Sequence, residues 1–216
     1  MDTVAARLQM VDQQIRTWEV LDPRVLDALV RVPREAFVPP EYRELAFADT
    51  SVPIACGQTM LAPKMQGRIL QALDLEQRDR VLEIGTGTGY LAAAMSLLAH
   101  ETTSIEIMPE LAAAATRNLG SFAEARVKVE SRDAFGPDSL GEYDAIAVTG
   151  SLPVYDKRFE RALGVGGRLF VVVGVAPVME AMIIRRVDAT EWVSEALFET
   201  VIPALIGATV APRFVF

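Results

Sequence analysis

Apolar and polar positions change their spacing along the chain near residue 80. Before that point, apolar residues recur at helical spacing between prolines, which is typical of amphipathic helices. Asp22 followed by Pro23 is typical of a helix start, and Pro63 predicts the start of another helix. The stretch 51–60 contains a proline and a glycine and predicts an irregular loop. We therefore expect residues 1–79 to form a helical cap that includes this loop.

Beyond residue 80, short apolar strands alternate with helical segments. The sequence predicts strands at 80–84, 102–107, 127–130, 143–149, 169–173, 182–186 and 197–201, and helices at 90–99 and 109–119. Strands that alternate with helices of about 10–15 residues are typical of a parallel sheet covered on both faces. The predicted fold class is therefore α/β, with a doubly wound, mostly parallel sheet. No long linker separates the cap from residues 80–216, so residues 1–216 are predicted to form a single domain.

A glycine-rich motif between a strand and a helix is the strongest chemical signal. Residues 83–90 read Glu-Ile-Gly-Thr-Gly-Thr-Gly-Tyr. Glycines permit a tight turn there and let a ligand approach the backbone. Glu106 ends the next predicted strand, 106 − 85 = 21 residues after Gly85. That spacing matches the acidic residue that binds ribose hydroxyls in doubly wound folds, although a plain turn and a solvated carboxylate remain the alternatives.

The glycine spacing also distinguishes between cofactors. Dinucleotide-binding folds use Gly-x-Gly-x-x-Gly, whereas this motif reads Gly-x-Gly-x-Gly. Glu83 before the loop would repel a diphosphate but suits a cationic or amino-bearing ligand. The motif resembles the first motif of S-adenosylmethionine-dependent methyltransferases, so NAD-dependent oxidoreduction is disfavoured. By this resemblance, the cofactor contacts are assigned to Glu83, Gly85, Thr86, Gly87, Thr88, Gly89, Glu106, Asp133 and Ala134.

Composition and charge exclude several classes of function. The chain has 21 basic and 29 acidic residues, and its net charge of −8 argues against nucleic acid as a partner. One histidine and one cysteine make a zinc centre or an internal disulfide improbable, so no metal is expected. The most apolar run, 169–184, is interrupted and too short to span a membrane, and the N-terminus resembles no secretory signal. We therefore expect no membrane partner, a cytoplasmic location and a monomer.

Most of the chain, from about residue 8 to about residue 200, resembles the protein-L-isoaspartate O-methyltransferase family. The matching segments are 11–16, 22–26, 32–39, 57–59, 62–63, 80–90 and 166–169. The resemblance implies an enzyme that uses S-adenosylmethionine to methylate the free carboxylate of L-isoaspartyl residues in damaged proteins or peptides, a repair reaction. D-aspartyl residues are a second candidate acceptor. It also implies the methyltransferase type of doubly wound sheet.

The chain departs from this family in the loop over the active site. The family reads Thr-Ile-Ser-x-Pro there, whereas this chain reads Thr59-Met-Leu61-Ala-Pro63. The resemblance assigns catalytic positions to Thr59 and Leu61, and leucine cannot donate a hydrogen bond as serine does. Losing one donor to a charged group costs about 1.5–3 kcal/mol. A methyltransferase of the same fold with a small-molecule acceptor, or a catalytically silent relative, therefore stays open.

Two further side chains in this region have competing interpretations. Lys64 is either a replacement cation for the acceptor carboxylate or a solvated lysine at a helix start. Cys56 is either a nucleophile or a small buried apolar residue, and we favour the second. The methionines at 60, 65 and 95 are predicted to fill the core, and Trp18 and Trp192 are predicted to be packing residues.

Overall fold

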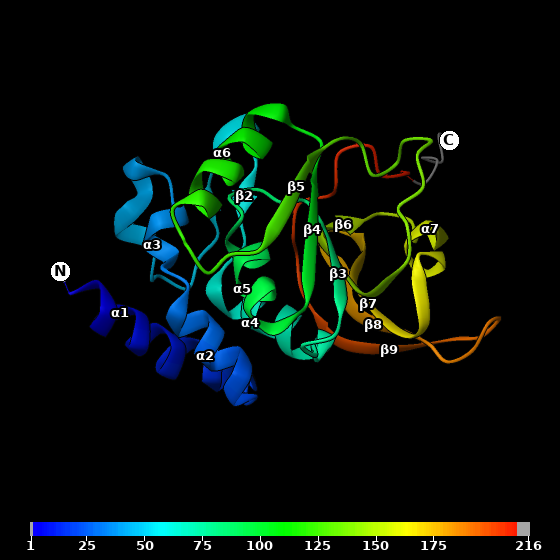
Figure 1. Cartoon of the computed structure of the whole chain (residues 1–216), viewed down its shortest axis with the longest axis horizontal. Coiled ribbons are helices and arrows are strands. Elements are labelled where there is room, and N and C mark those ends of the chain that lie inside the picture. The colour runs from blue at the N-terminus through cyan, green and yellow to red at the C-terminus, as the bar shows by residue number, and fades with distance from the viewer. Residues whose placement is uncertain (1, 211–216) are drawn as a thin grey trace.

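A seven-stranded sheet runs through the computed structural model, which describes residues 2–210 (Figure 1). Its strands are β3 (Arg80–Ile84), β4 (Glu101–Glu106), β5 (Val127–Ser131), β6 (Tyr143–Leu152), β7 (Leu163–Val175), β8 (Val178–Arg186) and β9 (Trp192–Glu199). They lie in the order β5-β4-β3-β6-β7-β8-β9. The five strands from β5 to β7 are parallel, and β8 and β9 are added antiparallel. This confirms the predicted α/β class with a mostly parallel sheet.

The longer helices gather on one side of this sheet, as Figure 1 shows. They are α1 (Thr3–Met10), α2 (Pro23–Arg31), α4 (Pro63–Leu73), α5 (Tyr90–Leu98) and α6 (Pro109–Gly120), and the four-residue helix α3 (Arg34–Phe37) lies on the same side. The opposite side carries the five-residue helix α7 (Lys157–Arg161) and irregular chain. The sequence predicted that strands alternate with helices of about 10–15 residues and that the sheet is covered on both faces, but the helix on this second side is much shorter. The difference arises because residues 132–142 between β5 and β6 contain Gly136, Pro137 and Gly141, which interrupt a helix.

Side-chain alternation along the strands divides the core into two layers. On β3, Val81 is buried against the helical side, whereas the next residue, Leu82, is buried on the other side. Both are fully inaccessible to solvent, as expected for a strand of a sheet that is covered on both faces. On the second side, Phe159 of α7 and Leu140 of the irregular segment cover the sheet. Two sparsely helical segments therefore suffice to bury that face.

The N-terminal part is less regular than the pattern predicted. A π-helical turn (Val11–Ile15) and a 3-10 turn (Arg16–Trp18) follow α1. The loop at 51–60 contains two short antiparallel strands, β1 (Val52–Pro53) and β2 (Thr59–Met60). Trp18, predicted as a packing residue, is 45% exposed, and its ring packs against Lys64 at the surface rather than in the core. The three methionines expected in the core are buried.

The helix starts lie where the proline signals placed them. Asp22 accepts a hydrogen bond from the Arg24 backbone N–H at the start of α2, with Pro23 as the first helical residue.

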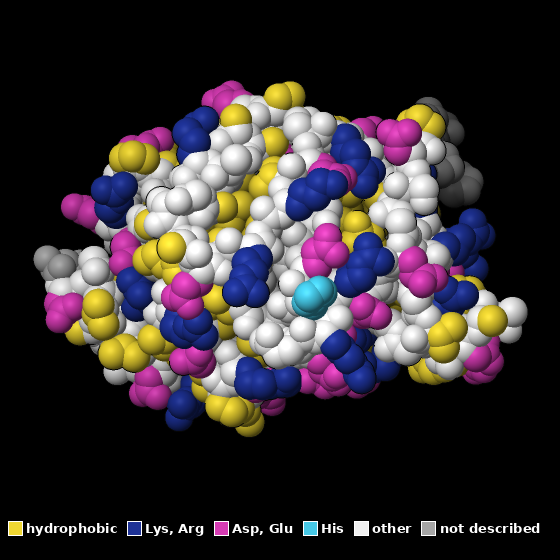
Figure 2. Space-filling view, in the orientation of Figure 1, with side chains coloured by type: hydrophobic (Ala, Val, Ile, Leu, Met, Phe, Trp, Pro, Cys, Tyr) yellow, Lys and Arg dark blue, Asp and Glu magenta, His cyan; other side chains and the backbone are white. Residues whose placement is uncertain are grey.

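Among residues 2–210, no helix has the length and apolarity that crossing a membrane requires. Met1 and residues 211–216, the ends of the single domain that we infer over 1–216, lie outside the described residues. On the face drawn in Figure 2, basic and acidic side chains are interspersed.

Candidate active site

The glycine-rich loop joins β3 to α5 in a sharp turn. Gly85, Gly87 and Gly89 all have positive φ angles, of 99°, 53° and 86°. A Cβ atom on Gly85 would lie 2.5 Å from the hydroxyl oxygen of Thr149 on β6. A Cβ atom on Gly89 would lie 3.2 Å from Leu119 of α6. The first and third glycines are therefore required by packing against neighbouring elements as well as by backbone conformation.

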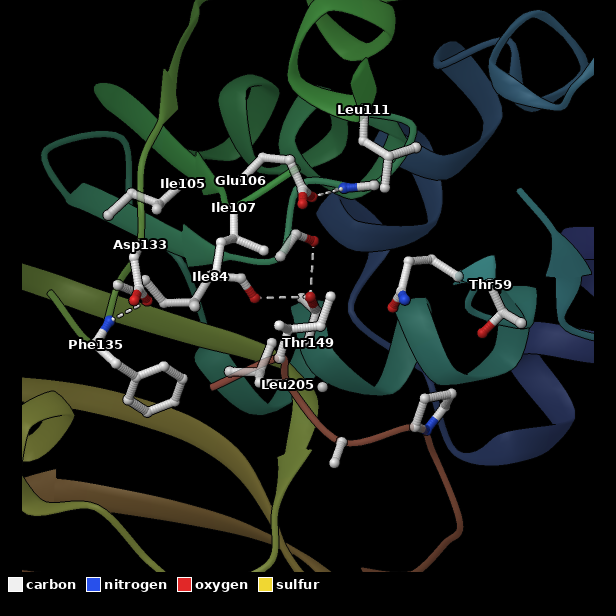
Figure 3. Close-up of a pocket in the computed structure, with 18 of the residues that line it drawn as sticks. Thr59, Ile84, Ile105, Glu106, Ile107, Leu111, Asp133, Phe135, Thr149 and Leu205 are labelled. Atoms are coloured by element: carbon white, nitrogen blue, oxygen red, sulfur yellow. Dashed lines mark hydrogen bonds between the residues drawn. The ribbon is translucent and has the colours of Figure 1, made fainter. Parts of the chain in front are cut away.

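A cavity opens above this loop, at the carboxyl ends of β3, β4 and β6, which is where ligands bind in open α/β sheets. Its walls combine apolar side chains with a few polar groups, namely Ile84, Ile105, Ile107, Leu111 and Phe135 together with Glu106, Asp133 and Thr149. Figure 3 shows Asp133 and Phe135 at one end of the cavity and Thr59 at the other, with Glu106 and Thr149 between them. Such a slot suits a ligand with one flat apolar end and several hydrogen-bonding groups.

Glu106 is held in place by backbone hydrogen bonds. Its side chain is 5% exposed, and Oε2 accepts the Gly87 N–H at 2.9 Å while Oε1 accepts the Met108 N–H at 3.0 Å (Figure 3). An ionised carboxylate offers about four acceptor sites, so these two bonds leave further sites for a ligand. Glu106 therefore orients the glycine loop and presents acceptors to the cavity.

Glu83 lies on the buried side of the same loop. It is 1% exposed, and Oε2 accepts a hydrogen bond of 2.5 Å from Ser104, whose hydroxyl contacts that of Thr86 at 2.6 Å. Burial raises the pKa of Glu83 to about 8, and the nearby Glu106 adds to this rise. The carboxyl is therefore mostly protonated at neutral pH in the ligand-free protein. Glu83 is therefore not the fixed negative charge that its place before the glycine loop predicted, and its charge depends on what binds beside it.

The segment after β5 forms a tight turn at the apolar end of the cavity. Asp133 Oδ1 accepts the Phe135 N–H at 2.8 Å, so Asp133 is a turn residue that also lines the cavity. Ala134 is buried beside it and lines the same cavity. Arg132, which sequence reasoning missed, lines the cavity as well, and its Nη1 atom is buried without a partner among the described residues. A single arginine after a strand gives no sequence signal.

The loop that follows β2 closes the other end. Leu61 is 7% exposed, and its carbonyl accepts a hydrogen bond of 2.9 Å from the guanidinium of Arg34. Arg34 is fully buried, donates also to the Ala46 carbonyl and to Gln66, and stacks on the ring of Tyr90. Burial lowers the pKa of Arg34 to about 10, so the group stays charged at neutral pH. This arginine fixes the loop against the start of α5.

The C-terminal segment completes the wall and was not foreseen. It contributes Pro203, Ala204, Leu205 and Ile206. Leu205 donates its N–H to the Ser151 carbonyl at 3.0 Å, and a Cβ atom on Gly150 would lie 2.8 Å from the Leu205 side chain. The only signal in the sequence was Gly150, a small residue directly after the predicted strand 143–149. It did not indicate which distant segment packs against it.

The structure brings together most of the predicted site residues. Seven of them line the main cavity: Thr59, Leu61, Gly85, Gly87, Glu106, Asp133 and Ala134. A smaller adjoining cavity is lined by Glu83, Thr86 and Thr88, and shares Thr59 and Leu61 with the first. Gly89 lines neither cavity, because it packs on α6. Its role as a cofactor contact therefore has no geometric support.

One side chain near the site differs from its predicted role. Cys56 is half-buried at φ 58°, with Sγ 3.6 Å from Glu110 Oε2, so it is not the buried apolar residue that we predicted. Desolvation and this carboxylate raise the pKa of the thiol, which disfavours the reactive thiolate. Lys64 pairs with Asp49. Within residues 2–210, no cluster of His, Cys, Asp and Glu is arranged to hold a metal ion.

Comparison with known proteins gives consistent matches. A family model described as Protein-L-isoaspartate(D-aspartate) O-methyltransferase (PCMT) matches residues 5–204. The chain is 40% identical over 201 residues to protein-L-isoaspartate O-methyltransferase 2 of Pelobacter propionicus, covering 92% of this chain and 89% of the relative. It is also 40% identical over 188 residues to a protein of the same name from Marinobacter nauticus, covering 86% of each.

Solved structures share the same fold. A beta-aspartate methyltransferase (PCMT) from Plasmodium falciparum, in complex with S-adenosyl-L-homocysteine, superposes with a TM-score of 0.80 at 20% identity. The match covers 92% of this chain and 97% of that one. At this level of identity, the likeness shows that the two chains share the methyltransferase type of α/β fold.

Proposed function

The chain belongs to the protein-L-isoaspartate O-methyltransferase family, and we propose that it transfers a methyl group from S-adenosylmethionine to the free carboxylate of L-isoaspartyl residues. The observation that carries this proposal is the position of Glu106 in the main cavity. The Gly87 N–H donates a hydrogen bond to its carboxylate, and the loop that follows β2 closes the cavity at Leu61. Damaged proteins and peptides are the proposed partners. We retain the expectations of a monomer and of a cytoplasmic location as parts of this proposal.

The donor set of the cavity fits S-adenosylmethionine. Glu106 offers free acceptor sites for the two ribose hydroxyls. The apolar walls and the turn at Asp133 suit the adenine ring, with Phe135 beside it. The smaller cavity, with Glu83 and Thr88, suits the charged amino-acid end. Bound there, the cofactor supplies an electrophilic methyl group on a positively charged sulfur atom.

The reaction requires little acid–base catalysis from the protein. An acceptor carboxylate is already ionised at neutral pH, so no general base is needed. A carboxylate oxygen forms the new bond to the methyl carbon, and the bond from that carbon to sulfur breaks with its electron pair left on sulfur. The products are a methyl ester and a neutral thioether. The protein therefore acts by holding the acceptor oxygen in line with the methyl carbon and the sulfur atom. Accurate positioning of this kind lowers the activation free energy by several kcal/mol.

Positioning falls to the loop around Thr59 and Leu61. Thr59 lines both adjoining cavities and brings a hydroxyl to their junction. Leu61 contributes only apolar surface, and Arg34 fixes its backbone. These residues exclude water from the methyl group and limit where the acceptor lies. The buried Leu61 also favours a second candidate function, methyl transfer to a small and more apolar acceptor, because it offers no donor for a carboxylate.

Transfer of radiolabelled methyl to a synthetic hexapeptide tests the proposal. The peptide carries one L-isoaspartyl residue, and the matched control carries L-aspartate at the same position. We expect label in the isoaspartyl peptide alone, as a base-labile ester. Equal labelling of both peptides, or no labelling while the protein binds S-adenosylmethionine in calorimetry, would overturn the assigned acceptor and favour the small-molecule alternative.

A further inference from the structure

A separate cavity lies against the other side of Leu61, along the outer surface of α4. We call it the α4 cavity. It has a volume of about 310 Å³, and its lining includes Trp18, Asp49, Lys64, Arg68 and Phe198. Among residues 2–210, Leu61 alone lines this cavity and both cavities of the proposed donor site. The α4 cavity therefore adjoins the donor site at Leu61.

Two cations of α4 face this cavity, one helical turn apart. Lys64 Nζ lies 2.7 Å from Asp49 Oδ2 and 4.3 Å from the centre of the Trp18 ring. Arg68 stacks on the Phe198 ring at 4.6 Å. Because residues four apart lie on the same face of a helix, the aromatic rings hold both positive charges on the cavity side.

The ion pair between Lys64 and Asp49 is exposed enough for Lys64 to exchange Asp49 for another carboxylate. The two side chains are 30% and 33% exposed, so water reaches both. Ion pairs of this kind contribute little to stability, because solvent weakens their attraction and both side chains lose freedom. A substrate carboxylate could thus replace Asp49 at Lys64 at small cost. Leu61 cannot bind that carboxylate, whereas Lys64 stands three residues further on at the start of α4.

The α4 cavity also has the extent that a polypeptide needs. Arg68 lines a second, open hollow of about 590 Å³ that continues along α4 to Asp74. Helix α4 has 11 residues and is about 16 Å long, which matches about five residues of extended chain. A small molecule would leave most of this length empty. The shape favours a polypeptide whose acceptor residue lies at the Leu61 end.

We propose that the acceptor polypeptide lies in the α4 cavity and that Lys64 binds its reacting carboxylate after releasing Asp49. Lys64 would then supply the charge that Leu61 cannot. This inference rests on the proposed function, because it assumes a carboxylate acceptor that reaches the methyl group from the side opposite sulfur.

Kinetics of two variants with opposite expected effects test this assignment. In Lys64→Gln, KM for the isoaspartyl hexapeptide should rise about 10-fold, while KM for S-adenosylmethionine stays unchanged. In Asp49→Asn, KM for the peptide should fall about threefold, because Lys64 no longer needs to exchange its partner. A merely structural ion pair predicts that both variants change in the same direction, and that result would overturn the proposal.

Lys128→Gln is the matched control. Lys128 also forms an ion pair of 2.7 Å, with Glu130 on β5, and lines neither the donor cavities nor the α4 cavity. Its substitution should leave both KM values unchanged. A rise in peptide KM equal to that of Lys64→Gln would show a general charge effect and contradict a specific role for Lys64.

Direct binding separates this inference from the proposed function. Trp18 and Trp192 are the only tryptophans, so Trp192→Phe makes Trp18 the sole reporter of the α4 cavity. With S-adenosylhomocysteine present, the isoaspartyl peptide should change Trp18 fluorescence, and Lys64→Gln should raise its Kd about 10-fold. For a peptide with a carboxamide in place of the carboxylate, Lys64→Gln should have no effect. Binding with these differences but without methyl transfer would refute the function and keep the site, whereas no fluorescence change would refute the site.

Discussion

The donor half and the acceptor half of the site are built in different ways. The donor half comes from one continuous stretch, the glycine loop, and from Glu106 on the adjacent strand. The acceptor half combines Leu61 and the buried Arg34 that fixes its backbone with the α4 cavity, whose lining comes from segments far apart in the sequence. Parallel strand pairing positions the first, whereas contacts between residues far apart in sequence position the second. Substitutions in the donor half should therefore strongly reduce stability or cofactor affinity. Substitutions in the acceptor half should mainly change which acceptor is used and how well.

The largest effect is expected for Gly85→Ala. A methyl group there would meet the Thr149 hydroxyl at 2.5 Å, and φ is 99°. Overlap and backbone strain together should lower the free energy of unfolding by about 2–4 kcal/mol. Urea denaturation measures this loss. The double variant Gly85→Ala with Thr149→Ala should recover the part caused by overlap; no recovery would show that backbone strain alone is responsible.

A smaller but specific effect is expected for Glu106→Ala. The two proposed ribose contacts lose a charged acceptor, and the Gly87 N–H loses its partner. Affinity for S-adenosylmethionine should fall by about 1.5–3 kcal/mol, or about 10- to 150-fold. The free energy of unfolding should also fall by about 1–3 kcal/mol, because the Gly87 and Met108 N–H groups lose their acceptor. Unchanged affinity in calorimetric titration would place the ribose elsewhere and remove the main support for the donor site.

The two halves also differ in how far the sequence predicted them. The strand before the glycine loop, the loop itself and Glu106 follow from local apolar runs, glycine spacing and one strand-to-strand distance. Arg34 and Leu205 escaped prediction, because their roles depend on contacts with residues 27 and 54 positions away. The sparse helices on the second sheet face were missed for a related reason. There, Phe159 and Leu140 bury the strands without a periodic pattern of their own.

Leu61→Ser tests the acceptor half directly. If position 61 faces the acceptor carboxylate, a hydroxyl there should raise kcat/KM for the isoaspartyl peptide by up to about 10- to 100-fold, with cofactor affinity nearly unchanged. The fold should lose about 2–3 kcal/mol, because a buried leucine is removed. Leu61→Ala is the control, since it makes the same space without a donor. Equal kinetics in the two variants would mean that space, and not hydrogen bonding, limits the reaction.

A pH dependence of stability is expected for Glu83 beneath the donor site. Its pKa is raised to about 8 by burial, so the folded protein keeps a proton that the unfolded chain releases above about pH 4.5. The contribution of Glu83 to stability is therefore greatest below that pH and is lost as pH rises toward 8. Denaturation at several pH values should show this slope in the wild type, and Glu83→Gln should remove it.

Binding of the cofactor should favour loss of the Glu83 proton, whereas burial in the ligand-free protein favours keeping it. A positively charged cofactor beside Glu83 favours the ionised carboxylate, so binding should release up to one proton at neutral pH. Ser104, which donates a hydrogen bond to Glu83, favours the same form, whereas Glu106 opposes it. Affinity for S-adenosylmethionine should therefore rise severalfold between pH 6.5 and 8, and less for S-adenosylhomocysteine, which lacks the sulfonium charge. Calorimetry in two buffers of different ionisation enthalpy counts the protons. Equal proton release in Glu83→Gln would assign the titration to another group and leave the donor half without an electrostatic response to its ligand.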